Sequence, residues 1–342
     1  MQGARVEEPF RGSEAVARGI VTPARLRGPR FVRLFPDVYV SAAVPMTPVL
    51  RARAASVYAG PLGAASAYSA AEILGASCGP WTAPAELVAP RRIRPRPDLL
   101  AHQGVPLEPG LCDGVRVTSP RATAWALCRR LELVDAVVAL DALAARRRDR
   151  PVFVPVQGTP APEQRRLSRM TAPCPGFDPA DLLVLRSRYP HVRGSARLDR
   201  VVALADPRAE SPPETRLRLL LVLSGLPVPQ VQFPLYDARG RPWARFDLAY
   251  PDALLAIEYD GAHHDDPLDR VRDTRTAALG WQTLRITADG LTRNAGRTVG
   301  TIRALLAQRT HLTSPRPAPA RRPGPHSTPP PALVHVPPSI ST

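Results

Sequence analysis

The chain has 342 residues, 44% of them apolar, which is enough for two domains that each bury a core and excludes a disordered protein. All 46 basic residues are arginine and the formal net charge is +16, which favours a polyanionic partner, most simply nucleic acid. There is no run of about 18 apolar residues and no apolar N-terminal segment, so we expect neither a membrane span nor a secretory signal and place the protein in the cytoplasm.

Residues 1–45 predict a winged helix-turn-helix. A first short helix covers SEAVARGI, and Thr22 followed by Pro23 is typical of a cap and first turn of a second helix. Apolar segments on both sides of Pro36–Asp37 predict a hairpin that would form the wing. Four arginines in or after the second helix are candidates for phosphate contacts: Arg25, Arg27, Arg30 and Arg33.

Residues 46–150 predict a mixed region of helices and strands. An alanine-rich helical segment covers 47–75, and strands are expected near 84–90 and 114–118. Two helices should follow, the first capped by Ser119.

Residues 151–210 are rich in proline and predict a linker with connecting helices near 179–189 and 195–205. The proline-rich tail, 311–342, cannot build a packed core, so we expect it to be disordered.

Residues 211–310 predict the order helix, three strands, helix, strand, helix. Ser211 caps the first helix, and the turn signals DARG and PD separate three strand-like runs that should form an antiparallel meander. A helix ending at Gly280, the strand WQTLRIT and a last amphipathic helix complete the order.

Acidic side chains gather within this last region, where residues 258–273 hold six acids against two arginines. Asp247 lies near the end of the second strand, and Glu258 and Asp260 end the third. Neighbouring strands are about 4.8 Å apart, so the three carboxylates can converge, and a hard cation such as Mg²⁺ would offset their repulsion. Glu214 could reach the same metal or simply favour the N-terminus of its helix.

Together these motifs resemble one known superfamily. Asp247, the run I-E-Y-D-G around Glu258, His264, Arg272-Asp273-x-Arg275, and the later Leu279-Gly280-Trp281 and Leu284-Arg285 resemble the PD-(D/E)XK endonucleases, closest to their Vsr-like branch, over about 100 residues. The resemblance implies an αβββαβα restriction-endonuclease-like sandwich and metal-dependent hydrolysis of phosphodiesters, with catalytic acids at Asp247 and Glu258.

The family's lysine is replaced by Asp260, and the chain has no lysine to take its place. The Vsr-like branch implies a histidine after this strand, so His264 is the candidate general base and His263 a weaker one. Arg275 could stabilise charge developing on the phosphate, and Asp273 could orient either group.

The N-terminal region has a second resemblance. The segments LFPDVYV and SAAEILG are similar to the winged-helix region of abortive-infection Ei-type antitoxins. We therefore expect a mixed α/β protein that acts on DNA, most simply double-stranded, as an endonuclease dependent on Mg²⁺ or Mn²⁺. The alternative is an antitoxin-like DNA-binding regulator with an inactive nuclease fold. For Arg272, contact with DNA and an ion pair with an acid on its own helix both stay open.

Overall fold

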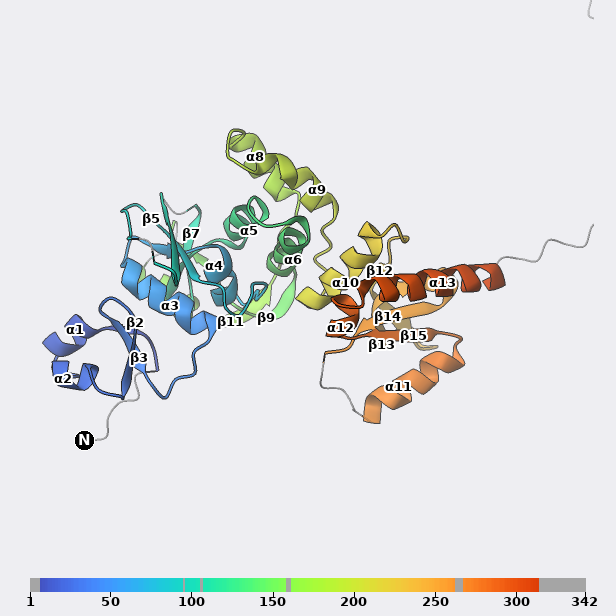
Figure 1. Cartoon of the computed structure of the whole chain (residues 1–342), viewed down its shortest axis with the longest axis horizontal. Coiled ribbons are helices and arrows are strands. Elements are labelled where there is room, and N and C mark those ends of the chain that lie inside the picture. The colour runs from blue at the N-terminus through green and yellow to red at the C-terminus, as the bar shows by residue number, and fades with distance from the viewer. Residues whose placement is uncertain (1–6, 95, 105–106, 158–160, 262–266, 314–342) are drawn as a thin grey trace, which may run out of the picture.

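The computed structural model describes residues 7–94, 96–104, 107–157, 161–261 and 267–313 of a mixed α/β protein (Figure 1). We call residues 7–45 the N-terminal body, 46–209 the middle body and 210–313 the C-terminal body. The N-terminal and C-terminal bodies lie at opposite ends of the molecule, with the middle body between them (Figure 1). The predicted tail beyond residue 313 lies outside the described residues.

The N-terminal body has the predicted order of two helices and a hairpin, preceded by one further strand. Its elements are β1 (Phe10–Arg11), α1 (Gly12–Ala17), α2 (Pro23–Leu26), β2 (Phe31–Phe35) and β3 (Val38–Ser41). The sheet order is β1-β3-β2, and Thr22 caps α2 as predicted, accepting a hydrogen bond from the Arg25 backbone N–H. Phe35 and Val38 pack with α3 (Pro48–Ala59) and β5 (Ala85–Ala89) of the middle body, which holds the two bodies together.

The middle body is built on a six-stranded sheet in the order β10-β7-β8-β4-β5-β6. Its strands are β4 (Ala64–Ala65), β5 (Ala85–Ala89), β6 (Leu99–Gln103), β7 (Pro109–Cys112), β8 (Val115–Thr118) and β10 (Val154–Pro155). Strands β5 and β8 confirm the two predicted strands. The segment predicted to be helical over 47–75 forms two helices, because Gly60, at φ 80°, ends the first and β4 then pairs with β5 and β8 before the second begins.

Within the described residues, seven α-helices and a small two-stranded antiparallel sheet complete the middle body. They are α3 (Pro48–Ala59), α4 (Ala67–Ile73), α5 (Pro120–Cys128), α6 (Leu133–Ala144), α7 (Ala161–Leu167), α8 (Asp181–Arg188) and α9 (Leu198–Ala203), with β9 (Arg147–Pro151) paired to β11 (Thr171–Cys174). The interval 151–210 was predicted as linker and connecting helices. Its helices α8 and α9 bury Leu182 and Leu198 in the same core as α5 and α6, so this interval packs as part of the middle body.

The C-terminal body shows the predicted order, with one short helix added before the last. Its elements are α10 (Pro212–Leu223), β12 (Gln230–Tyr236), β13 (Pro242–Tyr250), β14 (Leu255–Tyr259), α11 (Pro267–Ala278), β15 (Gln282–Ile286), α12 (Ala288–Leu291) and α13 (Ala295–Thr313). The sheet order is β12-β13-β14-β15; β14 is antiparallel to β13 and parallel to β15. Parallel pairing requires a crossover, which α11 supplies.

Helices cover both faces of this sheet. Leu217 of α10 and Ile302 of α13 pack with Leu248 and Ile257 of the sheet on one face. Trp281, which follows α11, packs with Phe246 in a second cluster, and α11 lies on the side of the sheet opposite α10 and α13 (Figure 1). The ends of β13 and β14, where the predicted acids lie, are therefore flanked by α10 and α11.

Helix α10 is shared by two hydrophobic cores. Its Leu217 and Leu221 pack in the core of the C-terminal body, whereas Leu219 packs in the core of the middle body. Ser211 caps the helix as predicted. The same helix thus anchors the candidate site and attaches the C-terminal body to the rest of the chain.

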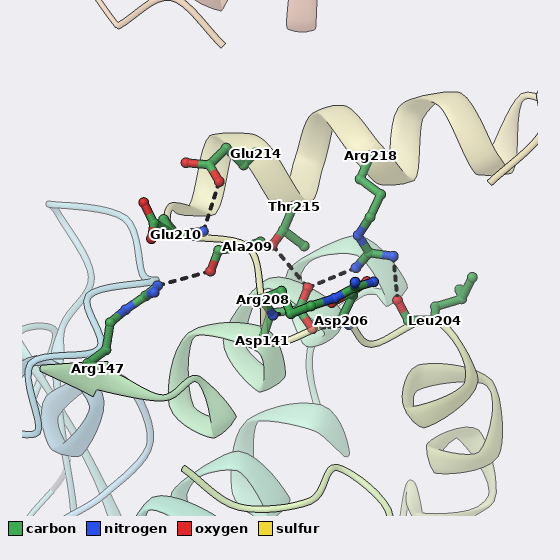
Figure 2. Close-up of polar contacts among 10 residues, drawn as sticks. All are labelled: Asp141, Arg147, Leu204, Asp206, Arg208, Ala209, Glu210, Glu214, Thr215 and Arg218. Atoms are coloured by element: carbon green, nitrogen blue, oxygen red, sulfur yellow. Dashed lines mark hydrogen bonds and ion pairs between the residues drawn. The ribbon is translucent and has the colours of Figure 1, made fainter. Parts of the chain in front are cut away.

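A buried polar network reinforces this attachment (Figure 2). The carboxylate of Asp141 on α6 accepts hydrogen bonds from Arg218 Nη2 at 2.8 Å, Thr215 Oγ1 at 3.0 Å and the Asp206 backbone N–H at 2.7 Å. Arg218 also donates to the carbonyl of Leu204 at 2.8 Å. Asp141 is 1% exposed, so its charge depends on these partners.

Across the residues that the structure describes, no helix combines the length and the apolar character needed to cross a lipid bilayer.

Candidate active site

Asp247 and Glu258 lie on adjacent strands of the C-terminal body. The β13–β14 register pairs Leu248 with Ile257, so the next position outward sets Asp247 opposite Glu258. Asp247 Oδ2 accepts a hydrogen bond from the Tyr259 backbone N–H at 3.0 Å, which ties it to β14. The predicted proximity of these two acids follows from the antiparallel meander that the turn signals indicated.

The surroundings of Asp247 disfavour its charged form. Burial, with the carboxylates of Glu214, Glu258 and Glu210, raises the pKa of this carboxyl to about 6, against a lowering by the Tyr259 N–H. A partly buried acid surrounded by like charges releases its proton reluctantly. A bound cation would remove this penalty, so the electrostatics suit a site for a positively charged ligand.

Glu258 lies against two arginines instead. It is 7% exposed, and its Oε2 lies 2.9 Å from Arg272 Nη2 and 3.7 Å from Arg285 Nε. Asp273 bridges the same arginines, at 2.7 Å from Arg285 Nη2 and 3.9 Å from Arg272 Nε. Arg272, a candidate for DNA contact or for an ion pair on its own helix, therefore pairs with Asp273 on that helix and, more closely, with Glu258 on the sheet.

Arg285 is a site residue that the sequence-based reasoning did not select. It appeared only as part of the motif that ends in Leu284-Arg285. The parallel β14–β15 register pairs Glu258 directly with Arg285, so the strand order places a guanidinium beside the acid. The alternation along β15 indicated a strand but not its partner, and only the pairing identifies this residue.

Asp260 and the histidines follow β14. The Asp260 backbone N–H donates to the Ile286 carbonyl at 2.9 Å, which holds the end of β14 against β15. The candidate bases His263 and His264 lie outside the described residues. Among the residues that the structure does describe, no three His, Cys, Asp or Glu side chains form a group that could hold a metal ion. Among the described residues, the predicted convergence of three carboxylates is therefore not seen, although Asp247 lies opposite Glu258.

Glu214 has the contacts of the helix-capping alternative. Its Oε1 accepts from Ser211 Oγ at 2.7 Å, and its Oε2 accepts from the Glu210 backbone N–H and from Gln232 Nε2, each at 2.8 Å. Figure 2 shows the carboxylate turned back to the start of α10. Its charge still reaches Asp247, because it raises the pKa of that carboxyl.

Gln232 is a second residue that sequence-based reasoning missed. It lies on β12 between the register pairs Val231–Leu248 and Phe233–Phe246, hence opposite Asp247. Its φ of 54° is left-handed, which costs a non-glycine residue about 1 kcal/mol or more. A glutamine within an apolar strand carries no signal for this conformation; the structure shows it joining β12 to Glu214.

Arg275 is held away from the two acids. Its guanidinium stacks over Trp243 of β13, 3.9 Å from the ring centroid. This cation–π contact is typical of arginine at a partly exposed site. Arg275, which was predicted to stabilise charge on the phosphate, therefore lies against the sheet. Among the described residues, no contact of Arg275 with Asp247 or Glu258 is seen.

The four predicted DNA-contacting arginines of the N-terminal body are all exposed: Arg25, Arg27, Arg30 and Arg33. None makes an ion pair with a described residue. They lie at the other end of the molecule from the Asp247–Glu258 pair (Figure 1), so any single substrate that touches both must span the middle body.

No family model matches the chain, and no solved structure matches it significantly. Two curated proteins of Mycobacterium tuberculosis are similar to it: "Uncharacterized protein MT2308" of strain CDC 1551 / Oshkosh and "Uncharacterized protein Rv2248" of strain ATCC 25618 / H37Rv. Each is 31% identical over 211 residues, which cover 60% of this chain and 67% of the relative. The chain therefore belongs to the same protein family as these two mycobacterial proteins.

Proposed function

We propose that the protein is a metal-dependent endonuclease that hydrolyses DNA phosphodiester bonds in its C-terminal body, which would have the PD-(D/E)XK sandwich layout. The observation that carries this proposal is the electrostatic state of Asp247, a half-buried carboxyl with a pKa raised to about 6 by burial and neighbouring carboxylates. Acids perturbed in this way concentrate at catalytic sites.

The available donor atoms fit a hard divalent cation. Within the described part of the chain, Asp247 Oδ1 and the Asp260 carboxylate accept no hydrogen bond, so oxygen donors are available next to Glu258. Mg²⁺ or Mn²⁺ held by Asp247 and Glu258, with Asp260 joining once its side chain moves toward them, would polarise the phosphate and acidify the attacking water. Glu214 is committed to the start of α10 and would act through its charge.

The chain's own cations would complete the site. Arg272 and Arg285 flank Glu258, so they supply positive charge beside the acid in a protein that lacks the family's lysine. Arg275 would leave Trp243 to meet a phosphate, and His264 remains the candidate base for the water proton. The N-terminal body, with the layout of a winged helix, would dock the DNA through its exposed arginines.

The second candidate is a DNA-binding, antitoxin-like regulator with an inactive nuclease fold. The pairing of Glu258 with Arg272 favours it, because an acid committed to a guanidinium is a weaker metal ligand. So does Asp260 in the place of the lysine.

A plasmid assay separates the two candidates. The full-length protein is incubated with supercoiled plasmid and Mg²⁺ or Mn²⁺, beside Asp247→Asn, Glu258→Gln and the control Asp252→Asn, an exposed acid of the same body. We expect nicking to fall about 100-fold or more in the first two variants and to persist in the control, because the metal supplies several kcal/mol of charge stabilisation. DNA binding without nicking in either metal would establish the regulator instead.

A further inference from the structure

A large groove lies between the N-terminal and middle bodies, far from the candidate active site. Its volume is about 2010 Å³. One wall comes from residues 8–43 and the other from three segments of the middle body: 53–63, 111–116 and 156–169. The sequence alone does not predict this groove, because the residues that form its walls are up to about 160 positions apart along the chain.

The lining of the groove is strongly basic. Its arginines are Arg11, Arg18, Arg25, Arg30, Arg53, Arg116, Arg165 and Arg169, and its acids are Glu8, Glu14 and Asp113. Arg25 and Arg30 were predicted to contact phosphates, whereas the arginines of the middle body were not. The predicted basic face thus extends across a second body.

Each of the three acids lies beside one of two arginines, Arg53 and Arg11, and the eight arginines of the lining exceed its acids by five. Glu8 and Asp113 both pair with Arg53, and Glu14 lies 3.9 Å from Arg11. The other six arginines make no ion pair with any described residue. Arg116 has, in addition, a buried Nε without a hydrogen-bond partner in the described part of the protein. Six unneutralised guanidinium groups in one groove repel each other until an anion enters.

The size of the groove favours a polymer over a small anion. Pockets for drug-sized ligands measure about 300–1,000 Å³, so this groove exceeds the largest of them by roughly twofold. Phe10 and Phe31 also line it, in edge-to-face contact at 5.6 Å. Both rings are half-buried against Ala15, Val21 and Leu26 and form part of the wall. A basic groove with aromatic rings in its wall is typical of sites for single-stranded nucleic acid, where arginines follow the backbone and bases stack on rings.

We infer that this groove binds a single strand of nucleic acid, held jointly by Arg25 and Arg30 of the N-terminal body and by Arg116, Arg165 and Arg169 of the middle body. The inference rests on the nucleic-acid-binding part of the proposed function and does not depend on cleavage. It assigns the middle body a direct role in holding the substrate.

The test measures binding of the full-length protein, in EDTA, to a fluorescein-labelled oligo-dT strand by fluorescence anisotropy over a salt series. Arg165→Gln/Arg169→Gln alters two exposed side chains, and a triple variant adds Arg116→Gln. The control, Arg148→Gln/Arg200→Gln/Arg239→Gln, removes the same charge from exposed sites outside the groove.

We expect the triple variant to bind about tenfold or more weakly, with a salt slope shallower by about 2, since each lost contact to a single strand removes about 0.7. The double variant should show about two thirds of that change in slope, and the control almost none. An equal loss in the control would overturn the inference, because total charge and not the groove would then govern binding.

Two further outcomes would also overturn it. Tighter binding of the matched duplex with the same sensitivity to these substitutions would assign the groove to double-stranded DNA. Displacement of the strand by polyglutamate at equal charge concentration would assign it to an acidic protein. Failure of the proposed function gives a different result, because a protein that never nicks plasmid can still bind the strand as expected here. If the groove variants bind the strand as tightly as the unmodified protein and still nick plasmid, only the inference about the groove is refuted.

Discussion

Asp141, which is buried, and Asp247, which is half-buried, lie about 100 residues apart in sequence and have opposite surroundings. The pKa of each is raised to about 6, with burial as the largest cause. At Asp141 this rise is opposed by Arg218, Thr215 and the Asp206 N–H. At Asp247 the Tyr259 N–H opposes it, while the carboxylates of Glu214, Glu258 and Glu210 add to it. The neighbours of Asp141 stabilise its anion inside the protein, whereas the neighbours of Asp247 supply no comparable positive charge.

The contrast separates a structural acid from a candidate functional one. Asp141 joins α6 to α10 and has donors for its oxygens (Figure 2), so its role is complete within the chain. Asp247 becomes favourable only when a cation or proton reaches it. An acid whose pKa its own neighbours raise is therefore the better guide to chemistry, even though Asp247 is only half-buried and Asp141 is 1% exposed.

The largest effect should come from removing the structural acid. Asp141→Ala leaves the Arg218 guanidinium buried without its partner, and we expect the free energy of unfolding to fall by about 3–5 kcal/mol. Urea unfolding followed by circular dichroism measures this change. Asp149→Ala, at an exposed position on β9, should stay within about 0.5 kcal/mol of the unmodified protein.

A paired replacement sharpens that result. Asp141→Leu/Arg218→Met removes both charges, and most of the lost stability should return, since apolar side chains of similar size can replace a buried ion pair. A loss below about 1 kcal/mol in Asp141→Ala would mean that the two bodies are held together without this network.

Removing the candidate catalytic acid should have the opposite sign. Asp247 holds its proton up to about pH 6 in the folded protein, against 3.8 in the reference state, so raising the pH through this window weakens the folded state. Asp247→Asn keeps an acceptor for the Tyr259 N–H without the charge. We expect it to be more stable than the unmodified protein by about 1–2 kcal/mol at pH 8 and equally stable at pH 4.

Unfolding midpoints of both proteins across this pH range test the prediction. Asp252→Asn, an exposed acid of the same body, should show no such window. A constant difference between Asp247→Asn and the unmodified protein at all pH values would mean that the substitution acts through packing.

The smallest effect should come from the metal itself. At pH 8, Mg²⁺ at ten times its dissociation constant should stabilise the unmodified protein by about 1.4 kcal/mol, because it binds the folded state only. Thermal unfolding with and without Mg²⁺ measures this shift, and Ca²⁺ provides a second hard cation. Equal stabilisation of Asp247→Asn would show that the ion binds elsewhere.

Local signals predicted much of the C-terminal body. Ser211 caps α10 because serine followed by proline suits a helix start, and the turn signals between β12, β13 and β14 led to antiparallel neighbours. The adjacency of Asp247 and Glu258 follows from that meander. In the middle body, the alanine-rich run predicted to be helical is divided at Gly60 into two helices.

Long-range pairing was beyond such signals. Arg285 reaches Glu258 because β15 pairs in parallel with β14, and Gln232 reaches Glu214 because β12 bends at a left-handed residue. Both depend on which strands become neighbours. A side-chain periodicity reports the face of a strand and says nothing about the strand beside it.

The sequence by itself determined the order of the C-terminal elements, the caps of its helices and the concentration of acid in a basic chain, since propensity, turns and composition act over a few residues. Only the tertiary structure decided that Glu258 lies between arginines, that α10 serves two cores and that arginines from two bodies meet in one groove. Those features come from contacts between segments far apart in the chain, whose free energy is gained only once the whole fold excludes water.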